Sequence, residues 1–291
     1  MNKQTYAVDL HCHTWKSDNN HSIDEVLRIA CERGVTHLAI TDHDTTAGLD
    51  EAIRLGEERG IEIVPGIEIS AYDFKRKRRA HILGLYVTPG HAALHDLCRP
   101  TVRLRDELSR KMVELLISAG YRISWAQVEA YAKEGTGVYK QHIMHALIDE
   151  GYADSIYGPV YDKLFKRAEN GKPGVAYLPM TYVDAVDAIA AIREAGGIPI
   201  LAHPGQLGNF EAVEEWAKAG LQGIEAYHPS HSEEHTARAI GLAERFGLAI
   251  TGGSDYHGFY GNSSELPGTY GIDLAGLERI RGIRQGTGEA L

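Results

Sequence analysis

Short apolar runs alternate with amphipathic stretches over the first ninety residues of the chain. Apolar runs that fit β-strands lie at 6–10, 35–41, 61–70 and 80–87. Two segments between them, 22–33 and 46–59, have helical periodicity. Ser22 and Glu25 form the sequence pattern of a capping box, and Gly60 suits the left-handed residue at which a helix ends. This alternation predicts repeated βα units and a parallel sheet.

The β pattern fades after about residue 89 and returns after residue 177. Helical patterns occupy the interval, at 102–119, 124–133, 141–150 and 159–167. Further on, the pattern predicts helices at 182–195, 210–219 and 233–246 and strands at 198–202, 223–227 and 248–252. Seven strands in this order favour an α/β fold, a parallel βα barrel made by residues 1–88 and 178–291. Residues 89–177 would be an inserted helical subdomain that covers the active site. A doubly wound open sheet is the competing architecture.

The composition limits which functions the chain can have. It has 291 residues, of which 43% are hydrophobic and 24% charged, and no apolar run is long enough to cross a membrane. The first predicted strand begins close to the initiator Met, which leaves no room for a signal segment and predicts a cytoplasmic location. A net charge of −10 argues against a partner such as long nucleic acid, but a small phosphorylated substrate can be bound by local charge. The sequence leaves the oligomeric state open.

Histidines and carboxylates gather where the predicted strands end. A βα barrel collects the carboxyl ends of its strands at its active-site face, so side chains from distant segments meet there. The chain has 15 histidines, and its three cysteines lack the CxxC spacing of a thiolate metal site. Nine candidate metal ligands follow from this placement: His11, His13, Asp18, His43, Glu68, His81, His203, Asp255 and His257.

Six imidazoles and three carboxylates exceed what one ion can bind, so two or three divalent ions sharing a carboxylate are expected. Nitrogen-rich ligands favour Mn²⁺, Zn²⁺ or Fe over Mg²⁺ or Ca²⁺. Such ions would attract phosphate, and a hydroxide bridging two of them is the expected nucleophile. A single HxH motif is weak evidence, because histidines at strand ends often bond backbone carbonyls. An HxH pair and a DxH pair at opposite ends of the chain, with the other candidates between them, are together a strong signal.

Other polar residues near the predicted strand ends have weaker cases. Lys140 and His142, on the inserted helix, could bind a second phosphate or sugar, although a solvated helix face is equally expected. His228 and His231 follow the sixth strand, and either could bind phosphate or protonate the leaving group, although a second-layer or loop-packing role is almost equally expected. Asp42 and Asp44 flank His43 and are expected to orient its imidazole from the second layer, with direct chemistry an equally open alternative. The basic run 75–79 is interpreted as a solvated turn.

The motifs DLHCHT, ITDHDT, PGIEIS, HILG, LAHPG and GGSDYH occur in this order. Together they resemble the PHP (polymerase and histidinol phosphatase) family of metal-dependent phosphoesterases, within the wider amidohydrolase group. The resemblance implies a distorted seven-stranded βα barrel with a trinuclear centre, in which the nine candidates occupy the ligand positions. It is closest to enzymes that hydrolyse nucleoside 3′,5′-bisphosphates, RNA 5′ ends or ribose cyclic phosphates. Relatives of the bisphosphate type carry Arg-x-His in the insertion, where this chain has Lys140-Gln141-His142.

The sequence thus predicts a phosphoric ester hydrolase acting on a small metabolite of the nucleoside 3′,5′-bisphosphate or ribose cyclic phosphate type. Two alternatives are a histidinol-phosphate-type phosphatase and a 5′–3′ exonuclease that trims short RNA. A hydrolase of C–N bonds is disfavoured because no lysine lies at a predicted strand end. A non-catalytic metal-binding module is disfavoured because no ligand is missing.

Overall fold

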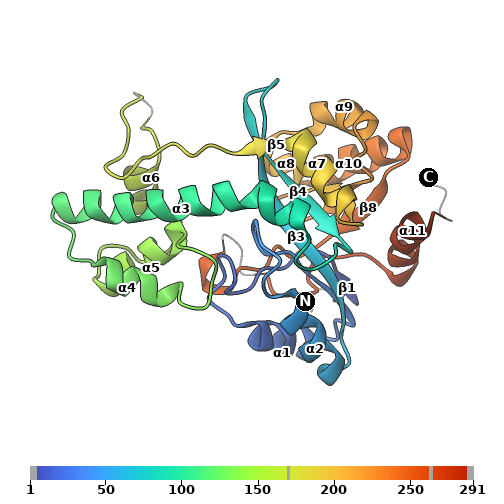
Figure 1. Ribbon diagram of the computed structural model, residues 1–291, viewed down its shortest axis with the longest axis horizontal. Coiled ribbons are helices and arrows are strands. Elements are labelled where there is room, and N and C mark those ends of the chain that lie inside the picture. The colour runs from blue at the N-terminus through green and yellow to red at the C-terminus, as the bar shows by residue number, and fades with distance from the viewer. Residues whose placement is uncertain (1–4, 169–170, 262–264, 287–291) are drawn as a thin grey trace.

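One mixed sheet curls into a barrel on one side of the molecule, and a lobe of helices projects from it (Figure 1). The computed structural model describes residues 5–168, 171–261 and 265–286. The strands follow the path β1-β2-β3-β4-β6-β7-β8, and the short β5 pairs with β3. Their bounds are β1 Val8–Asp9, β2 His37–Ile40, β3 Glu62–Asp73, β4 Arg78–Leu85, β5 Val183–Asp184, β6 Ile198–Leu201, β7 Gly223–Tyr227 and β8 Ala249–Gly252. The seven strands of the path confirm the predicted barrel.

The direction of β4 corrects the prediction of an all-parallel sheet. β4 runs antiparallel to both of its neighbours, β3 and β6, while the other pairs along the path are parallel. The reason is the four-residue turn at 74–77, which is too short for the helical crossover that a parallel connection needs. The N-terminal half of β4 therefore lies beside the C-terminal half of β3, with His81 opposite Ser70.

The two ends of the sheet path meet beside β1. The Leu10 N–H donates to the Gly252 carbonyl at 3.1 Å, and the Asp255 N–H donates to the His11 carbonyl at 2.9 Å. At Gly253 the approach is so close that a Cβ atom would lie 2.4 Å from the His11 nitrogen, which only glycine allows. The barrel is therefore nearly closed, and the first and last strands lie at one seam.

Helices cover the outside of the barrel and bury its core. They are α1 Ile23–Glu32, α2 Leu49–Arg59, α7 Ala185–Glu194, α8 Pro204–Leu207, α9 Val213–Lys218, α10 Glu233–Phe246 and α11 Leu274–Gln285, with 3₁₀ turns at Phe210–Ala212 and Gly258–Tyr260. The predicted capping box is present, since the Ser22 hydroxyl accepts from the Glu25 N–H and the Glu25 carboxylate from the Ser22 N–H. α11 and the short α8 were not predicted.

Four helices between β4 and β5 form the projecting lobe: α3 Ala92–Ser118, α4 Trp125–Tyr131, α5 Lys140–Asp149 and α6 Pro159–Phe165. They enclose a separate hydrophobic cluster, which includes Met112, Leu147 and Phe165. α3 begins ten residues earlier than predicted, because the helix continues through Pro100. Within the described residues, no helix combines the length and hydrophobicity that crossing a membrane requires.

Candidate metal centre

Glu68 lies at the centre of the histidine cluster, and its side chain is only 1% exposed. One carboxylate oxygen, Oε2, lies 3.2–3.3 Å from ring nitrogens of three histidines, His11, His13 and His43. The other, Oε1, lies 2.8 Å from His81 Nδ1 and 2.9 Å from His203 Nε2. A single carboxylate thus contacts imidazoles from both halves of the chain, as a bridging ligand would.

His81 reaches this centre because β4 is antiparallel. Ser70 lies two residues after Glu68 on β3, so the two side chains share one face of the sheet. His81 pairs with Ser70 and therefore joins that face. Had β4 run parallel, its first residues would lie at the opposite end of the barrel from the other ligands.

Asp255 contributes a second shared carboxylate from the loop after β8. Its Oδ1 lies 3.2 Å from His11 Nε2 and 3.1 Å from His13 Nε2. Asp255 has a φ of 50°, and two other non-glycine residues of the centre, Asp44 and His203, also have positive φ values, of 58° and 24°. Such backbone conformations are costly outside glycine and are typical of functional sites.

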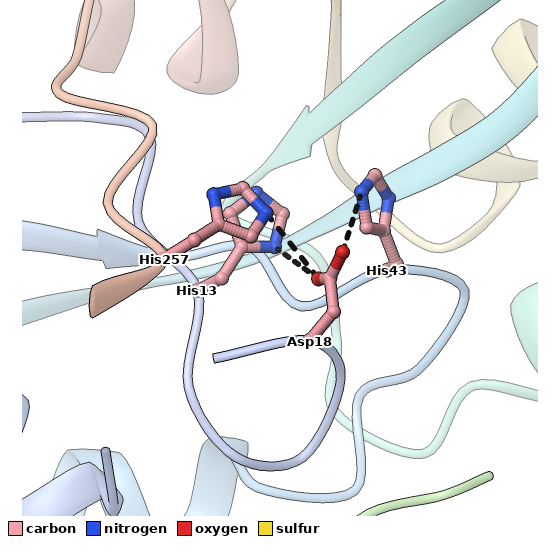
Figure 2. Close-up of side chains that lie close together, drawn as sticks. All are labelled: His13, Asp18, His43 and His257. Atoms are coloured by element: carbon pink, nitrogen blue, oxygen red, sulfur yellow. Dashed lines mark ion pairs between the residues drawn. The ribbon is translucent and has the colours of Figure 1, made fainter. Parts of the chain in front are cut away.

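A third carboxylate, Asp18, lies among three imidazoles (Figure 2). Its Oδ1 lies 3.3 Å from His257 Nε2 and 3.9 Å from His13 Nδ1, and its Oδ2 lies 4.0 Å from His43 Nε2. The His13 and His257 rings stack with centroids 4.0 Å apart. The HxH and DxH motifs from the two ends of the chain therefore form one side of the same cluster.

The donor atoms fit divalent ions. Groups of three or four ligand atoms lie within 4.8 Å of one another, and these groups contain eight of the nine predicted ligands. The ninth, His203, joins through its contact with Glu68. In the described part of the chain, six buried atoms of the cluster have no hydrogen bond: His11 Nε2, His13 Nε2, Asp18 Oδ1, His43 Nδ1, His203 Nδ1 and Asp255 Oδ1. Buried nitrogens and oxygens without such partners are what metal ligands require.

The electrostatics of the cluster agree with this interpretation. Burial alone would lower the pKa of His13, but the carboxylates of Asp255 and Glu68 outweigh it and raise that pKa to about 10. Burial would likewise raise the pKa of Glu68, but the surrounding histidines, His43 first, hold it well below its usual range. Without metal the cluster therefore binds protons, and divalent ions would displace them.

Two buried acids that the sequence analysis missed support these ligands. Glu225, on β7, contacts His11 Nδ1 through Oε1 at 3.1 Å and accepts the His203 N–H at 2.8 Å. Asp9 accepts backbone N–H groups of residues 11, 254 and 268, and burial raises its pKa to about 6. Both residues are acidic positions within apolar strands, a pattern that could have identified them.

A cavity of about 620 Å³ opens onto the cluster, between the barrel and the helical lobe. Its lining includes seven of the nine predicted ligands. The lobe contributes Arg105, Tyr139, Lys140, Gln141, Tyr157, Tyr161 and Lys166 to the wall. A cavity of this size suits a small metabolite rather than a folded polymer.

Comparison with known proteins decides the family. The PHP domain model matches residues 9–172, more than half of the chain. The chain belongs to the PHP domain family. It is 45% identical over 253 residues to a phosphoribosyl 1,2-cyclic phosphate 1,2-diphosphodiesterase of Eggerthella lenta, covering 87% of this chain and 95% of that protein. It is 31% identical over 278 residues to a 3′,5′-nucleoside bisphosphate phosphatase of Chromobacterium violaceum, covering 94% and 92% of the two chains.

A solved structure from Bifidobacterium adolescentis, assigned as a metal-dependent phosphoesterase, superposes with a TM-score of 0.83 at 29% identity. The match covers 97% of this chain and 98% of that one. The family, the α/β barrel and the phosphoesterase class predicted from the motifs are therefore confirmed.

Asp42 and Asp44, the two acids beside His43, are not among the candidate ligands of the cluster around Glu68. Asp42 accepts the Thr14 N–H at 2.8 Å, the Thr14 hydroxyl at 2.7 Å and the Ser17 hydroxyl at 2.6 Å, so it fastens the loop that carries Asp18. Asp44 accepts the Ser70 N–H at 2.8 Å. These bonds go to the loop of Asp18 and to the backbone of β3, not to the His43 ring that the two acids were expected to orient.

The four substrate-binding candidates separate into two pairs. His228 and Lys140 line the cavity of the PHP centre. His231 does not, because its Nδ1 donates to the Ala226 carbonyl at 2.9 Å and its Nε2 accepts the Gly205 N–H at 3.1 Å. His142 is 1% exposed, and its Nδ1 accepts the Tyr139 N–H at 3.0 Å as part of a helix cap. These backbone bonds direct His231 and His142 away from the predicted substrate contacts.

Arg79 corrects the interpretation of the basic run as a wholly solvated turn. Lys75 and Arg76 pair with Glu215, but Arg79 lines the cavity of the PHP centre. Across the cavity, burial, with a contribution from the charge of Arg79, lowers the pKa of Lys140 to about 8. Arg79 and Lys140 therefore both face the cavity beside the candidate ligands.

Proposed function

We propose that this PHP protein hydrolyses a phosphate ester of a small ribose phosphate, a cyclic phosphate first of all, at a centre of three divalent ions. The observation that carries the proposal is the convergence of nine ligands, six of them with buried unbonded atoms, at one end of a cavity with cationic walls. The relative that is 45% identical is named for a phosphoribosyl cyclic phosphate, which favours this ester.

The ligands divide into three positions around the shared carboxylates. One position would use Asp18, His43 and His257, and a second His11, His13, Glu68 and Asp255. The third would use His81 and His203 with Glu68. The imidazole-rich donor set suits Mn²⁺, Zn²⁺ or Fe. Bound ions of this kind lower the pKa of water toward 7 and offset charge on phosphoryl oxygens.

The residues of the chain supply binding and proton positioning. Arg79, Lys140 and Lys166 line the cavity beyond the ligands, where they would bind a phosphate that does not react. His228 accepts the Ser230 N–H at Nδ1, so its proton is held at Nε2, 3.2 Å from Asp255 Oδ2. This N–H would lie at the edge of the centre, where it would hydrogen-bond to the departing sugar oxygen.

The test is hydrolysis by metal-loaded protein. Protein prepared with Mn²⁺ or Zn²⁺ is assayed on a phosphoribosyl 1,2-cyclic phosphate, 3′,5′-bisphosphoadenosine, histidinol phosphate and short RNA. We expect the cyclic phosphate to give the highest kcat/KM. His43→Ala and Asp255→Ala should abolish turnover, whereas the exposed controls His95→Ala and Asp96→Ala should not. Full activity in the two site variants, or purified protein that binds no transition metal, would refute the proposal.

A nucleoside 3′,5′-bisphosphate is the second candidate. The bisphosphate phosphatase relative covers 94% of this chain, and the cationic wall suits a second phosphate in either substrate. Against it stands Lys140, which is a point charge where relatives of the bisphosphate type carry the bidentate arginine. A kcat/KM for bisphosphoadenosine above that for the cyclic phosphate would reverse the order.

A further inference from the structure

The helical lobe contacts one of the three metal positions directly. Gln141, on α5, donates from Nε2 to Asp18 Oδ2 at 2.7 Å and to the Tyr157 hydroxyl at 3.0 Å. This bond fixes the carboxylate so that Oδ1, which is buried and without a hydrogen bond, points toward His257. Gln141 thus orients a metal ligand from outside the barrel.

The same lobe fastens the loop on which Asp18 lies. The Thr136 N–H and hydroxyl both donate to the Lys16 carbonyl at 3.0 Å, and the Lys16 ammonium donates to the Glu134 carbonyl at 3.1 Å. At Gly135 a Cβ atom would lie 2.8 Å from the Trp15 carbonyl oxygen, so the two loops are in close contact. The backbone before Asp18 therefore depends on residues 134–136.

His43, another ligand of this position, is held by the lobe through a second network. Arg105, on α3, donates to the Asp44 carboxylate, and also to the Ser70 hydroxyl at 3.2 Å. Its guanidinium lies 4.5 Å from the centre of the Tyr139 ring, and the Tyr139 hydroxyl donates to the His43 carbonyl at 3.2 Å. Arg105 therefore stabilises the strained backbone of Asp44, directly after His43.

The remaining ligands are supported by the barrel itself. Glu225 holds His11 and the backbone of His203, and His228 contacts Asp255. These supporting residues lie on β7 or directly after it. The metal position of Asp18 and His43 is therefore braced from the lobe as well as by Asp42 of the barrel, whereas the supports named for His11, His203 and Asp255 come from the barrel.

We propose that the helical lobe completes the metal position of Asp18, His43 and His257, and that Gln141 and Arg105 are the positioning residues that set its affinity. The inference rests on the metal centre of the proposed function. Loss of an outer hydrogen bond to a metal ligand weakens binding by about 10–100-fold. That weakening should fall on one ion and leave the others bound.

The experiment measures metal stoichiometry and affinity rather than turnover. Metal-free wild type, Gln141→Leu and Arg105→Met are titrated with Mn²⁺ by equilibrium dialysis, and bound metal is counted by elemental analysis. The matched control is Arg110→Met, because Arg110 lies on the same helix and also stacks on a ring, that of Trp125, at 4.1 Å. Thermal unfolding of the metal-free proteins reports whether each variant folds. If Gln141→Leu does not fold, the isosteric Gln141→Glu is measured in its place.

We expect both site variants to bind one equivalent of Mn²⁺ about 10–100-fold more weakly, with the other equivalents and the control unchanged. Binding of every equivalent as in wild type would overturn the inference, and so would a uniform loss of all equivalents. A wild-type protein that binds no metal would instead refute the proposed function. The two failures are therefore distinguishable.

Discussion

Glu225 offers the sharpest test of how the barrel orients its ligands, and Glu225→Gln is the smallest change that tests it. The side chain is fully buried. Burial would raise its pKa, but His11 and His228 lower it overall, so Glu225 is ionised and accepts bonds at both oxygens. Glutamine has the same shape but only one oxygen. It can accept from the His11 ring or from the His203 N–H, and the other donor then faces its NH₂ group.

The expected magnitude follows from these two bonds. A buried donor left without a partner costs about 1–3 kcal/mol, and the remaining bond loses its charge assistance. We therefore expect the free energy of unfolding of the metal-free protein to fall by about 2 kcal/mol. Because His11 is then less firmly oriented, metal affinity should fall by about 10–100-fold.

Urea unfolding of the metal-free protein and Mn²⁺ titration measure the two quantities separately. Glu244→Gln is the matched control, since Glu244 is exposed on α10 and has the same chemistry. If Glu225→Gln binds metal and unfolds like wild type while the control does the same, the structural role assigned to Glu225 is wrong.

Three further predictions concern substrate binding, metal removal and the lobe. Because burial lowers the pKa of Lys140 to about 8, its positive charge is present below pH 8 and lost above it. KM for a phosphorylated substrate should therefore rise above about pH 8 in the wild type. In Lys140→Arg the same rise in KM should occur only at higher pH. An identical pH profile of KM in the two proteins would contradict this prediction. Removing bound metal with a chelator should lower Tm, because a ligand present at 100 times its Kd stabilises the folded protein by about 2.7 kcal/mol. A Tm that does not change with chelator would show that metal binding and folding are not linked. Leu147→Ala in the lobe core should cost about 2–5 kcal/mol in urea unfolding, and an unchanged midpoint would show that this core is loosely packed.

The clustering of the nine candidate ligands could be predicted because their positions follow from chain direction. His11, His43 and Asp255 each follow a strand, and parallel strands end at the same face of a barrel. The structure brings all nine predicted ligands together for this reason. His81 was included correctly in this cluster although β4 was predicted to run in the wrong direction. His81 lies near the start of β4, and the antiparallel direction of the strand places that start among the other candidate ligands.

The residues that sequence could not place are those whose partners are backbone groups. His228 and His231 lie three positions apart after the same strand, and nothing in their spacing shows that only one faces the cavity. His142 becomes a helix cap through the Tyr139 N–H, a contact that depends on where α5 begins. The sequence analysis did not assign a role to Gln141 or Arg105, because their partners Asp18 and Asp44 lie in the barrel, far from them in sequence.

The seam between β8 and β1 has a consequence for how the protein matures. Its close contact at Gly253 places the loop with Asp255 and His257 against His11 and His13, more than 240 residues earlier in the chain. While the ribosome is still synthesising the middle of the protein, neither of the late ligands exists. The nascent chain therefore cannot assemble the full set of candidate ligands until the last strand has docked against the first. Full occupancy by metal would then mark those molecules whose translation and folding are both complete.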